Sequence, residues 1–236
     1  MCAASTVRWS VAMTTAPRTP PTIDDTLASL NRAGWRDPII CRDDHRMGPY
    51  PNFLRALWIA WRRLEQYYFC SDVYPLESVQ PAYCLVVQDD IDISVGLKAH
   101  LTDRPPRQDG ITSLYTSAAF GKLPDGLHDA SHNHGRWPTS CGALALVFPW
   151  WIATRFLHNA PMPHKQLAAD YWISRWCRDN KIPYWIHAPS FVKHTGAVSS
   201  LDNPNTNHHW RQCRSWLPEV GGEPERMHYH QGHRKT

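Results

Sequence analysis

The sequence predicts an α/β fold in which a mostly parallel central sheet is flanked by helices. A short apolar run at 83–87 has the length and composition of a buried strand. The start of the chain alternates strand-like and helix-like segments, an order that builds parallel sheets. The 236 residues are 42% hydrophobic and 19% charged, so we expect one large folded domain rather than a disordered chain.

The first part of the chain is expected to form strand and helix units in turn. Residues 7–14 alternate between apolar and polar side chains and are rich in β-formers, which predicts a strand. Residues 53–68 have Phe53, Leu57 and Trp61 near one face, which predicts an amphipathic helix. Gly34 is a C-terminal stop for the first helix. The elements expected here are a strand at 7–14, a helix at 22–32, a strand at 38–41, a helix at 53–68 and the central strand at 83–87.

The second part of the chain continues this pattern around one long loop. Residues 121–138 are rich in Gly, His, Asp and Pro without a regular period, so they predict a surface loop. From 202 the chain is polar, and we expect one domain at 1–201 followed by a His- and Arg-rich extension at 202–236. The other expected elements are a helix at 95–101, strands at 111–115 and 142–149, helices at 150–158 and 165–179, and a strand at 184–187.

Cysteine spacing and the N-terminal sequence indicate the cellular compartment in which the protein is expected. The seven cysteines include no CxxC pair, so a zinc ribbon is not expected, and reduced buried thiols in a cytosolic protein account for them. Residues 1–15 lack the charged start and apolar block of a signal peptide, and no apolar run has the length of a membrane span. We therefore expect a cytoplasmic protein.

Three carboxylates, Asp89, Asp90 and Asp92, follow the central apolar run in the sequence Gln88-Asp89-Asp90-Ile91-Asp92. Ligands of open α/β sheets collect at the carboxyl ends of strands. Carboxylates crowded there repel one another unless a cation lies between them, and Mg²⁺ and Mn²⁺ prefer oxygen ligands. The same residues also suit a polar turn or a helix cap. The stretch by itself leaves a metal site and a plain turn open.

Four features occur in an order that, taken together, is informative. A strand is followed by Thr14-Thr15-Ala16-Pro17-Arg18, the acidic triplet 88–90 ends the central strand, a small-residue strand at 142–145 precedes a helix with Asp170, and Val192-Lys193-His194 comes last. This order resembles the GT-A (Rossmann-like) fold of nucleotide-sugar-dependent glycosyltransferases, over about 7–201. The triplet resembles the DxD motif of that family, in its Glu-Asp-Asp form. Gln88 departs from it by replacing the first carboxylate.

The resemblance implies roles for particular residues. A divalent metal, Mn²⁺ or Mg²⁺, would lie on the donor diphosphate, held by Asp90 and His194, with Asp92 compensating for Gln88. Asp170 matches the base that deprotonates the acceptor hydroxyl in inverting members. The donor-binding positions that the resemblance implies are Thr14, Thr15, Arg18, Asp44, Asn52, Gln88 and Asp89. The implied acceptor-binding positions are Tyr115, Trp137, Gly142 and Trp150.

The implied activity is transfer of a hexosyl or pentosyl group from a nucleotide sugar, with a UDP-sugar as the expected donor, to an acceptor hydroxyl. The acceptor that the resemblance implies is a glycan or a hydroxymethylated pyrimidine in DNA, as for small bacteriophage enzymes. For a phage-encoded protein the expected compartment is the host cytoplasm. A net charge of +4, the basic segment 104–107 and the basic tail fit a phosphate backbone, although a solvated tail fits equally.

Two other function classes fit the same residues. A metal-dependent nuclease or other phosphoryl enzyme could be built on the carboxylates at 89–92 and His194. An inert module that binds sugar nucleotides or glycans is suggested by Gln88, because it removes a carboxylate from the motif. Cleavage of DNA with metal alone, or sugar-nucleotide binding without turnover, separates these classes from a transferase.

Overall fold

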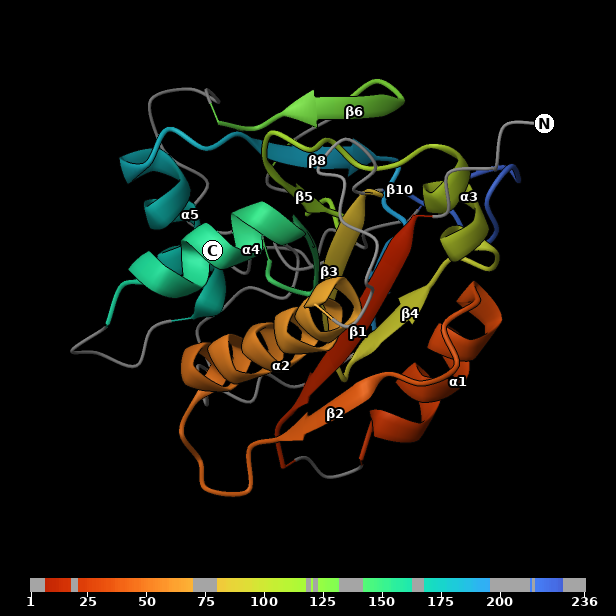
Figure 1. The fold of residues 1–236 in the computed structure, drawn as a ribbon. Helices are drawn as coiled ribbons and strands as arrows, with labels where there is room; N and C mark the ends of the chain where they lie inside the picture. The colour runs from red at the N-terminus through yellow and green to blue at the C-terminus, as the bar shows by residue number, and fades with distance from the viewer. Residues whose placement is uncertain are drawn as a thin grey trace, which may run out of the picture.

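A computed structural model of the chain describes residues 7–17, 21–69, 80–117, 120, 123–131, 142–162, 168–195, 213 and 215–226. Within them an α/β architecture is formed, as the sequence predicts (Figure 1). The helices are α1 (Ile23–Ala33), α2 (Pro49–Phe69), α3 (Leu97–Asp103), α4 (Trp150–Asn159) and α5 (Ala169–Asp179).

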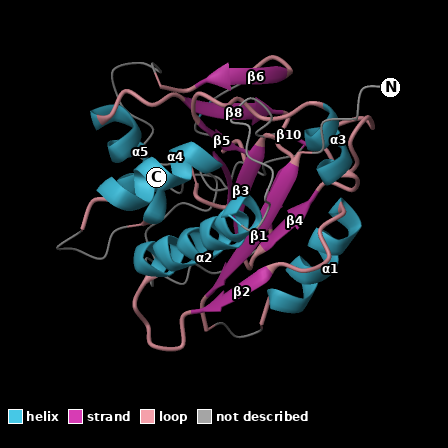
Figure 2. Ribbon diagram, viewed as in Figure 1, coloured by secondary structure: helices cyan, strands magenta, loops and turns pink. Residues whose placement is uncertain are grey.

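The central sheet has seven strands in the order β2-β1-β3-β7-β5-β8-β6. Five of them run in one direction, while β6 and β7 run in the other, so the sheet is mostly parallel, as predicted. Figure 2 shows these strands crossing the molecule between helices. The strands are β1 (Arg8–Thr15), β2 (Ile39–Arg42), β3 (Ala82–Gln88), β5 (Ile111–Ser113), β6 (Gly126–Asp129), β7 (Ala145–Pro149) and β8 (Tyr184–Ala188).

Helices and a small sheet cover the two faces of the central sheet. Side chains of α2, α4 and α5 form one apolar cluster with Cys84 and Val86 of β3. Side chains of α1 and α3 form the other, with Leu85 and Val87 of β3. The small antiparallel sheet of β4 (Ile91–Ile93) and β9 (Val192–His194) belongs to this second layer. Because β3 is buried on both faces, its sequence is apolar without alternation.

Helix α1 shows how closely local sequence determines this layer. Thr26, Ser29, Leu30 and Ala33 are its buried positions, at the spacing of one helical face. The helix ends at Gly34, whose φ of 105° lies in the left-handed region. The backbone N–H groups of Gly34 and Trp35 donate to Asn31 and Leu30, which closes the last turn. The predicted helix and its stop are therefore both confirmed.

The structure corrects several predicted elements. Residues 126–129 of the predicted loop form β6, which pairs with β8, while 132–141 lie outside the described residues. Strand β7 begins at Ala145 rather than at 142. Helix α5 begins at Ala169, and 163–167 of its predicted range are outside the described residues. The three-residue strands of the small sheet have no counterpart among the predicted elements, because they are too short to show a period.

The described C-terminal residues pack on the core. Strands β10 (Ser215–Trp216) and β11 (Glu225–Arg226) form a hairpin, and Cys213 and Trp216 are buried in the cluster that contains α1 and α3. The domain boundary expected at 201 lies between 196 and 212, outside the described residues, and stays a prediction. None of the described helices combines the length and apolarity that crossing a membrane requires.

Candidate functional site

One edge of the central sheet gathers the ends of several strands. Thr14, near the end of β1, is in register with Cys41 of β2 and with Gln88 of β3. The backbone N–H of Gln88 donates to the carbonyl of Leu144, 2.8 Å away, just before β7. Because β7 is antiparallel to β3, its beginning lies at the edge where the parallel strands end. The polar residues that follow β1, β2 and β3 therefore lie at one edge with those that precede β7.

Asp90 and His194 meet at this edge. The chain leaves β3 through Asp89 and Asp90 into β4, where Ile91 is in register with His194 of β9. His194 Nε2 lies 2.9 Å from Asp90 Oδ2, and the N–H of Thr195 donates to the Asp90 carbonyl. The two side chains are 12% and 3% exposed. The small sheet thus holds an imidazole and a carboxylate together in a nearly buried position.

A divalent cation bound with a diphosphate fits this pair. Hard cations such as Mg²⁺ are commonly held by one or two protein side chains, with substrate phosphates and waters completing the coordination. Asp90 and His194 can supply two such ligands. Across the described ranges, no three His, Cys, Asp or Glu side chains converge on a cation position. The pair accordingly suits a cation that arrives with a phosphorylated ligand rather than an all-protein cage.

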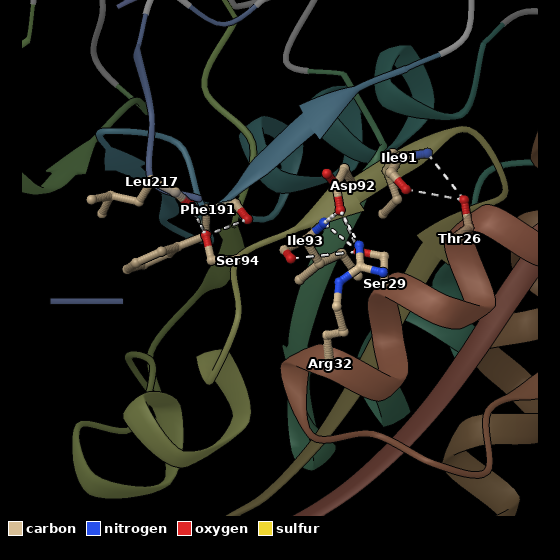
Figure 3. Close-up of polar contacts among 9 residues, drawn as sticks. All are labelled: Thr26, Ser29, Arg32, Ile91, Asp92, Ile93, Ser94, Phe191 and Leu217. Carbon is tan, nitrogen blue, oxygen red and sulfur yellow. Dashed lines mark hydrogen bonds and ion pairs between the residues drawn. The ribbon is translucent and has the colours of Figure 1, made fainter. Parts of the chain in front are cut away.

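Asp92 is engaged elsewhere. Its Oδ1 accepts from Ser29 Oγ at 2.8 Å and from Arg32 Nη2 at 3.1 Å, both on α1 (Figure 3). It does not join Asp90 and His194 in a three-ligand set. The compensation for Gln88 that the sequence suggested is therefore not seen in this arrangement. Gln88 itself is half-buried at the end of β3.

Helix α1 fixes the turn that carries Asp90. Thr26 Oγ1 lies 2.9 Å from the carbonyl of Asp89 and 3.0 Å from that of Ile91, and it also accepts from the N–H of Ile91. Ser29 Oγ accepts from the N–H of Ile93 at 2.6 Å (Figure 3). Sequence reasoning did not single out either hydroxyl. The available signal was two small polar residues, three positions apart, on the apolar face of a helix.

Ser94 connects β4 to two distant segments. Its hydroxyl contacts the carbonyl of Phe191, 2.9 Å away and just before β9, and the carbonyl of Leu217 (Figure 3). The N–H of Ser94 also donates to Phe191, and the N–H of Val95 donates to Pro218. The C-terminal segment is thereby joined to the strand pair that positions Asp90 and His194.

Several of the expected donor-binding residues lie where β1, β2 and β3 end. Asn52 is 3% exposed, and its Nδ2 donates to the carbonyls of Thr15 and Cys41 at 3.2 and 3.1 Å. The Thr14 hydroxyl donates to the carbonyl of Val87 at 3.3 Å. Asp44 is exposed in the next loop. Asp89 is 3% exposed beside Asp90. Arg18 lies outside the described residues.

Asp43 has a structural task in this loop. Its carboxylate accepts from the backbone N–H groups of Met47 and Gly48 at 2.7 and 3.0 Å. It is 7% exposed. These bonds close the loop between β2 and α2, which leaves Asp44 as the exposed carboxylate of the pair.

Asp170, Gly142 and Tyr115 come together beside β7. Asp170 lies in the first turn of α5, where its Oδ1 accepts from the N–H of Tyr171 at 2.9 Å. Its Oδ2 accepts from the N–H of Gly142 at 3.3 Å. Gly142 has a φ of +66°, and a Cβ there would lie 3.0 Å from the ring of the buried Tyr115. Since Gly142 shortly precedes Leu144, which contacts Gln88, the carboxylate of Asp170 lies toward the same edge.

Trp150, another expected acceptor-binding residue, packs in the core rather than with this group. Trp150 begins α4 and stacks on Trp61 of α2, with ring centroids 6.4 Å apart. It packs against the core cluster that contains α2, α4 and α5. Trp137 lies outside the described residues.

Comparisons with known proteins identify distant structural likenesses. Neither a family model nor a curated protein matches the chain. A nucleotidyl transferase from Methanothermobacter thermautotroptrophicus is 10% identical at a TM-score of 0.41, covering 77% of this chain and 88% of that one. A glycosyltransferase involved in the glycosylation of the major capsid of PBCV-1 is 11% identical at a TM-score of 0.40, covering 80% and 94%. At TM-scores this low, neither likeness assigns an activity to the chain.

Proposed function

We propose that the chain is a metal-dependent GT-A glycosyltransferase, which moves a sugar from a nucleotide sugar to an acceptor hydroxyl. The observation that carries this proposal is the pairing of His194 with Asp90 at 2.9 Å, directly after the central strand. The carboxylate of Asp170 near the same edge supports it, because a transferase needs a proton acceptor as well as a diphosphate site.

Asp90 and His194 would hold Mn²⁺ or Mg²⁺ with the donor diphosphate. The cation supplies charge neutralisation for the leaving group. The chain's own contribution is position. Strands β4 and β9 fix the two side chains, Thr26 holds the backbone on either side of Asp90, and Ser29 holds the backbone of Ile93. A UDP-sugar is the proposed donor, with its nucleoside near Thr15 and Asn52, where β1 and β2 end.

Asp170 would act as the base of an inverting displacement. The acceptor oxygen forms a bond to the anomeric carbon while the bond from that carbon to the diphosphate oxygen breaks. The acceptor proton passes to the Asp170 carboxylate, and the nucleoside diphosphate leaves with the bonding electrons. The N–H groups of Gly142 and Tyr171 fix the orientation of the carboxylate before the acceptor arrives. The proposed acceptor hydroxyl belongs to a hydroxymethylated pyrimidine in DNA.

Thermal shift and donor hydrolysis test this proposal together. A ligand at about 100 times its Kd stabilises the native state by about 2.7 kcal/mol. For a chain of this size that raises the Tm by roughly 5–10 °C. We expect such a shift with a UDP-sugar and Mn²⁺ in the wild-type protein. The Mn²⁺-dependent part of the shift, and slow donor hydrolysis, should be lost in Asp90→Asn and in His194→Ala.

Asp179→Asn is the matched control, because it removes an exposed carboxylate that pairs with Arg175 and Arg178 on α5. It should keep both the shift and the hydrolysis. Unchanged hydrolysis in Asp90→Asn would refute the metal assignment. Cleavage of DNA with Mn²⁺ alone would indicate a nuclease, and a donor shift without turnover would indicate a binding module.

A further inference from the structure

The outer face of α2 carries a row of basic and aromatic side chains, Arg55, Trp58 and Arg62, which we call the α2 stripe. All three are exposed, Trp58 by 52%. Their spacing of three and four residues places them on one side of the helix. At 1.5 Å per residue, Arg55 and Arg62 are about 10 Å apart along the axis.

The aromatic ring and the two cations form a connected surface. The guanidinium of Arg62 lies 6.0 Å from the ring centre of Trp58. Arg55 Nη1 donates to the carbonyl of Arg42 at 3.2 Å. Arg42 is itself exposed. The stripe is thereby connected to the end of β2, where the proposed donor site begins.

The N-terminal end of α2 contacts the helix that carries Asp170. The ring of Tyr50, on the buried side of α2, lies 6.1 Å from the ring of Trp172 on α5. Trp172 follows Asp170 by two positions in the first turns of that helix. A strand that lies along the stripe toward its Arg55 end is therefore directed toward the end of α2 that contacts α5.

The charge of this face is positive. Helix α2 contains three arginines and one glutamate. That glutamate, Glu65, has only 15% of its side chain exposed and is paired with Arg62. Arg63 adds a further cation beside the stripe, where its Nη1 donates to the carbonyl of Asp37. The surface thus combines an accessible aromatic face with Arg55 on one side of it and, on the other, an exposed Arg62 whose charge is partly offset by Glu65.

We propose that the α2 stripe binds a strand of nucleic acid, with one base stacked on Trp58 and phosphates neutralised by Arg55 and Arg62. Aromatic side chains in a basic surface are the general means of holding single strands, because every base has a stacking face. Arg55 and Arg62 lie about 10 Å apart along the axis, on either side of Trp58, so each is placed beside the backbone of a strand whose base stacks on that ring.

A neutral glycan is a poorer fit to this surface. A sugar ring could stack on Trp58, but the flanking guanidinium groups would find no anions to neutralise. The biological role of the stripe, as the path of a DNA acceptor, rests on the proposed transferase function. Binding of the strand can be measured whether or not that function holds.

Fluorescence anisotropy with a labelled oligothymidylate tests the proposal on the full chain. We expect binding that weakens with salt in the wild-type protein. Removing two phosphate contacts in Arg55→Gln/Arg62→Gln should lower the slope of log K against log[salt] by about 1.4. Trp58→Ala should weaken binding by about 5- to 150-fold, the range expected for loss of one stacked base.

Arg155→Gln/Arg178→Gln is the charge-matched control. Both of these arginines are exposed on other helices, where Arg155 bonds to Asn180 and Arg178 to Asp179. The control should retain wild-type affinity and slope. Equal losses in the control and in the stripe variant would overturn the proposal, as would unchanged binding in the stripe variants. The two stripe variants test it independently, so a folding defect in one leaves the other decisive.

Two further measurements distinguish a nucleic-acid surface from a glycan surface and from the proposed transferase function. Salt-independent binding of a neutral oligosaccharide that is lost in Trp58→Ala, without binding of the oligonucleotide, would overturn it in favour of a glycan surface. A thermal shift with a UDP-sugar and Mn²⁺ should persist in every stripe variant. If the wild-type protein binds the oligonucleotide through the stripe but shows no donor shift, the transferase function fails while the nucleic-acid surface stands.

Discussion

Asp90 and His194 are separated by 104 positions in the chain, yet their side chains lie 2.9 Å apart. Asp92 is only two residues from Asp90, and its carboxylate is bound by Ser29 and Arg32 instead. Closeness in sequence is therefore a poor guide to which carboxylates act together. The small sheet brings Asp90 and His194 together, because it pairs Ile91 with His194.

Replacing Asp92 with asparagine tests this division of roles. The side chains of Asp92 and Arg32 are 31% and 52% exposed, so their ion pair should contribute at most about 1 kcal/mol. We expect Asp92→Asn to lower the free energy of unfolding slightly in a urea titration and to keep the Mn²⁺ dependence of donor hydrolysis. Loss of that dependence with an unchanged unfolding curve would make Asp92 a metal ligand after all.

Gly142→Ala should damage both the fold and the orientation of Asp170. A φ of +66° strains any L-residue, and the new Cβ would lie 3.0 Å from the Tyr115 ring. Gly96→Ala is the matched control, since its φ is +76° with no atom within 4 Å. We expect each variant to lose more than about 1 kcal/mol of unfolding free energy, with the larger loss at Gly142. Equal losses of unfolding free energy in the two variants would show that the Tyr115 ring moves aside without destabilising the fold.

At the scale of elements, strong local patterns were predictable and short contacts were not. Strand β3 is buried on both faces, so its apolar run was visible in the sequence. Helix α1 was predicted from its opening at 22 and its glycine stop at Gly34. Strands β4 and β9 have three residues each and exist because they pair with one another. The partnership of Asp90 and His194 was expected from the resemblance to a family, since no spacing in the sequence connects them.

Strand β6 shows a second limit of sequence reasoning. Its four residues alternate between half-buried and exposed, and Leu127 is 39% exposed. With so little burial, the segment has no apolar pattern to separate it from a loop. It becomes a strand because β8 offers an edge to pair with, from Ala188 to Trp185.

Thr26→Val tests whether α1 positions the turn that carries Asp90. Valine keeps the shape of threonine but leaves the N–H of Ile91 and the carbonyl of Asp89 without this hydroxyl. Loss of such a buried partner costs about 1–3 kcal/mol. We expect a matching drop in unfolding free energy and a weaker Mn²⁺ response in thermal shift. Thr26→Ser, which retains the hydroxyl, should restore both, and a failure to do so would point to lost packing instead.

At the scale of the whole molecule, the C-terminal segment closes the second core layer. The backbone of Ser190 donates to Ser215 and accepts from Leu217, and that of Val95 donates to the carbonyl of residue 218 and accepts from the N–H of residue 220. Trp216 is 7% exposed within that layer, beneath the ammonium of Lys193, which lies 4.9 Å from its ring centre. These contacts connect the end of the described chain to the strands that carry the site.

Two truncated chains test how much this segment contributes. A chain that ends at 212 lacks the buried Trp216, whose burial contributes about 1.5–3 kcal/mol, and the backbone bonds around it. We expect its Tm to be at least about 5 °C below that of a chain that ends at 226, measured by differential scanning calorimetry. Equal melting temperatures would show that 213–226 adds no stability to the core.

Acidification should weaken the fold through His187, on β8. Burial lowers the pKa of His187, the carbonyl of Pro189 partly offsets this, and the charges of His100 and His128 lower it further. Its ring stacks on Phe191 at 4.0 Å. Below pH 6.5, the ordinary pKa of histidine, His187 binds a proton in the unfolded chain but stays neutral in the folded chain. The free energy of unfolding therefore falls as the pH decreases toward the folded-state pKa.

The variant His187→Gln tests this, because it has no imidazole to titrate at this position. We expect its Tm to fall less steeply than that of the wild-type protein between about pH 7 and pH 5, since other groups titrate alike in both. Parallel curves would show that His187 is not charged on unfolding in this range.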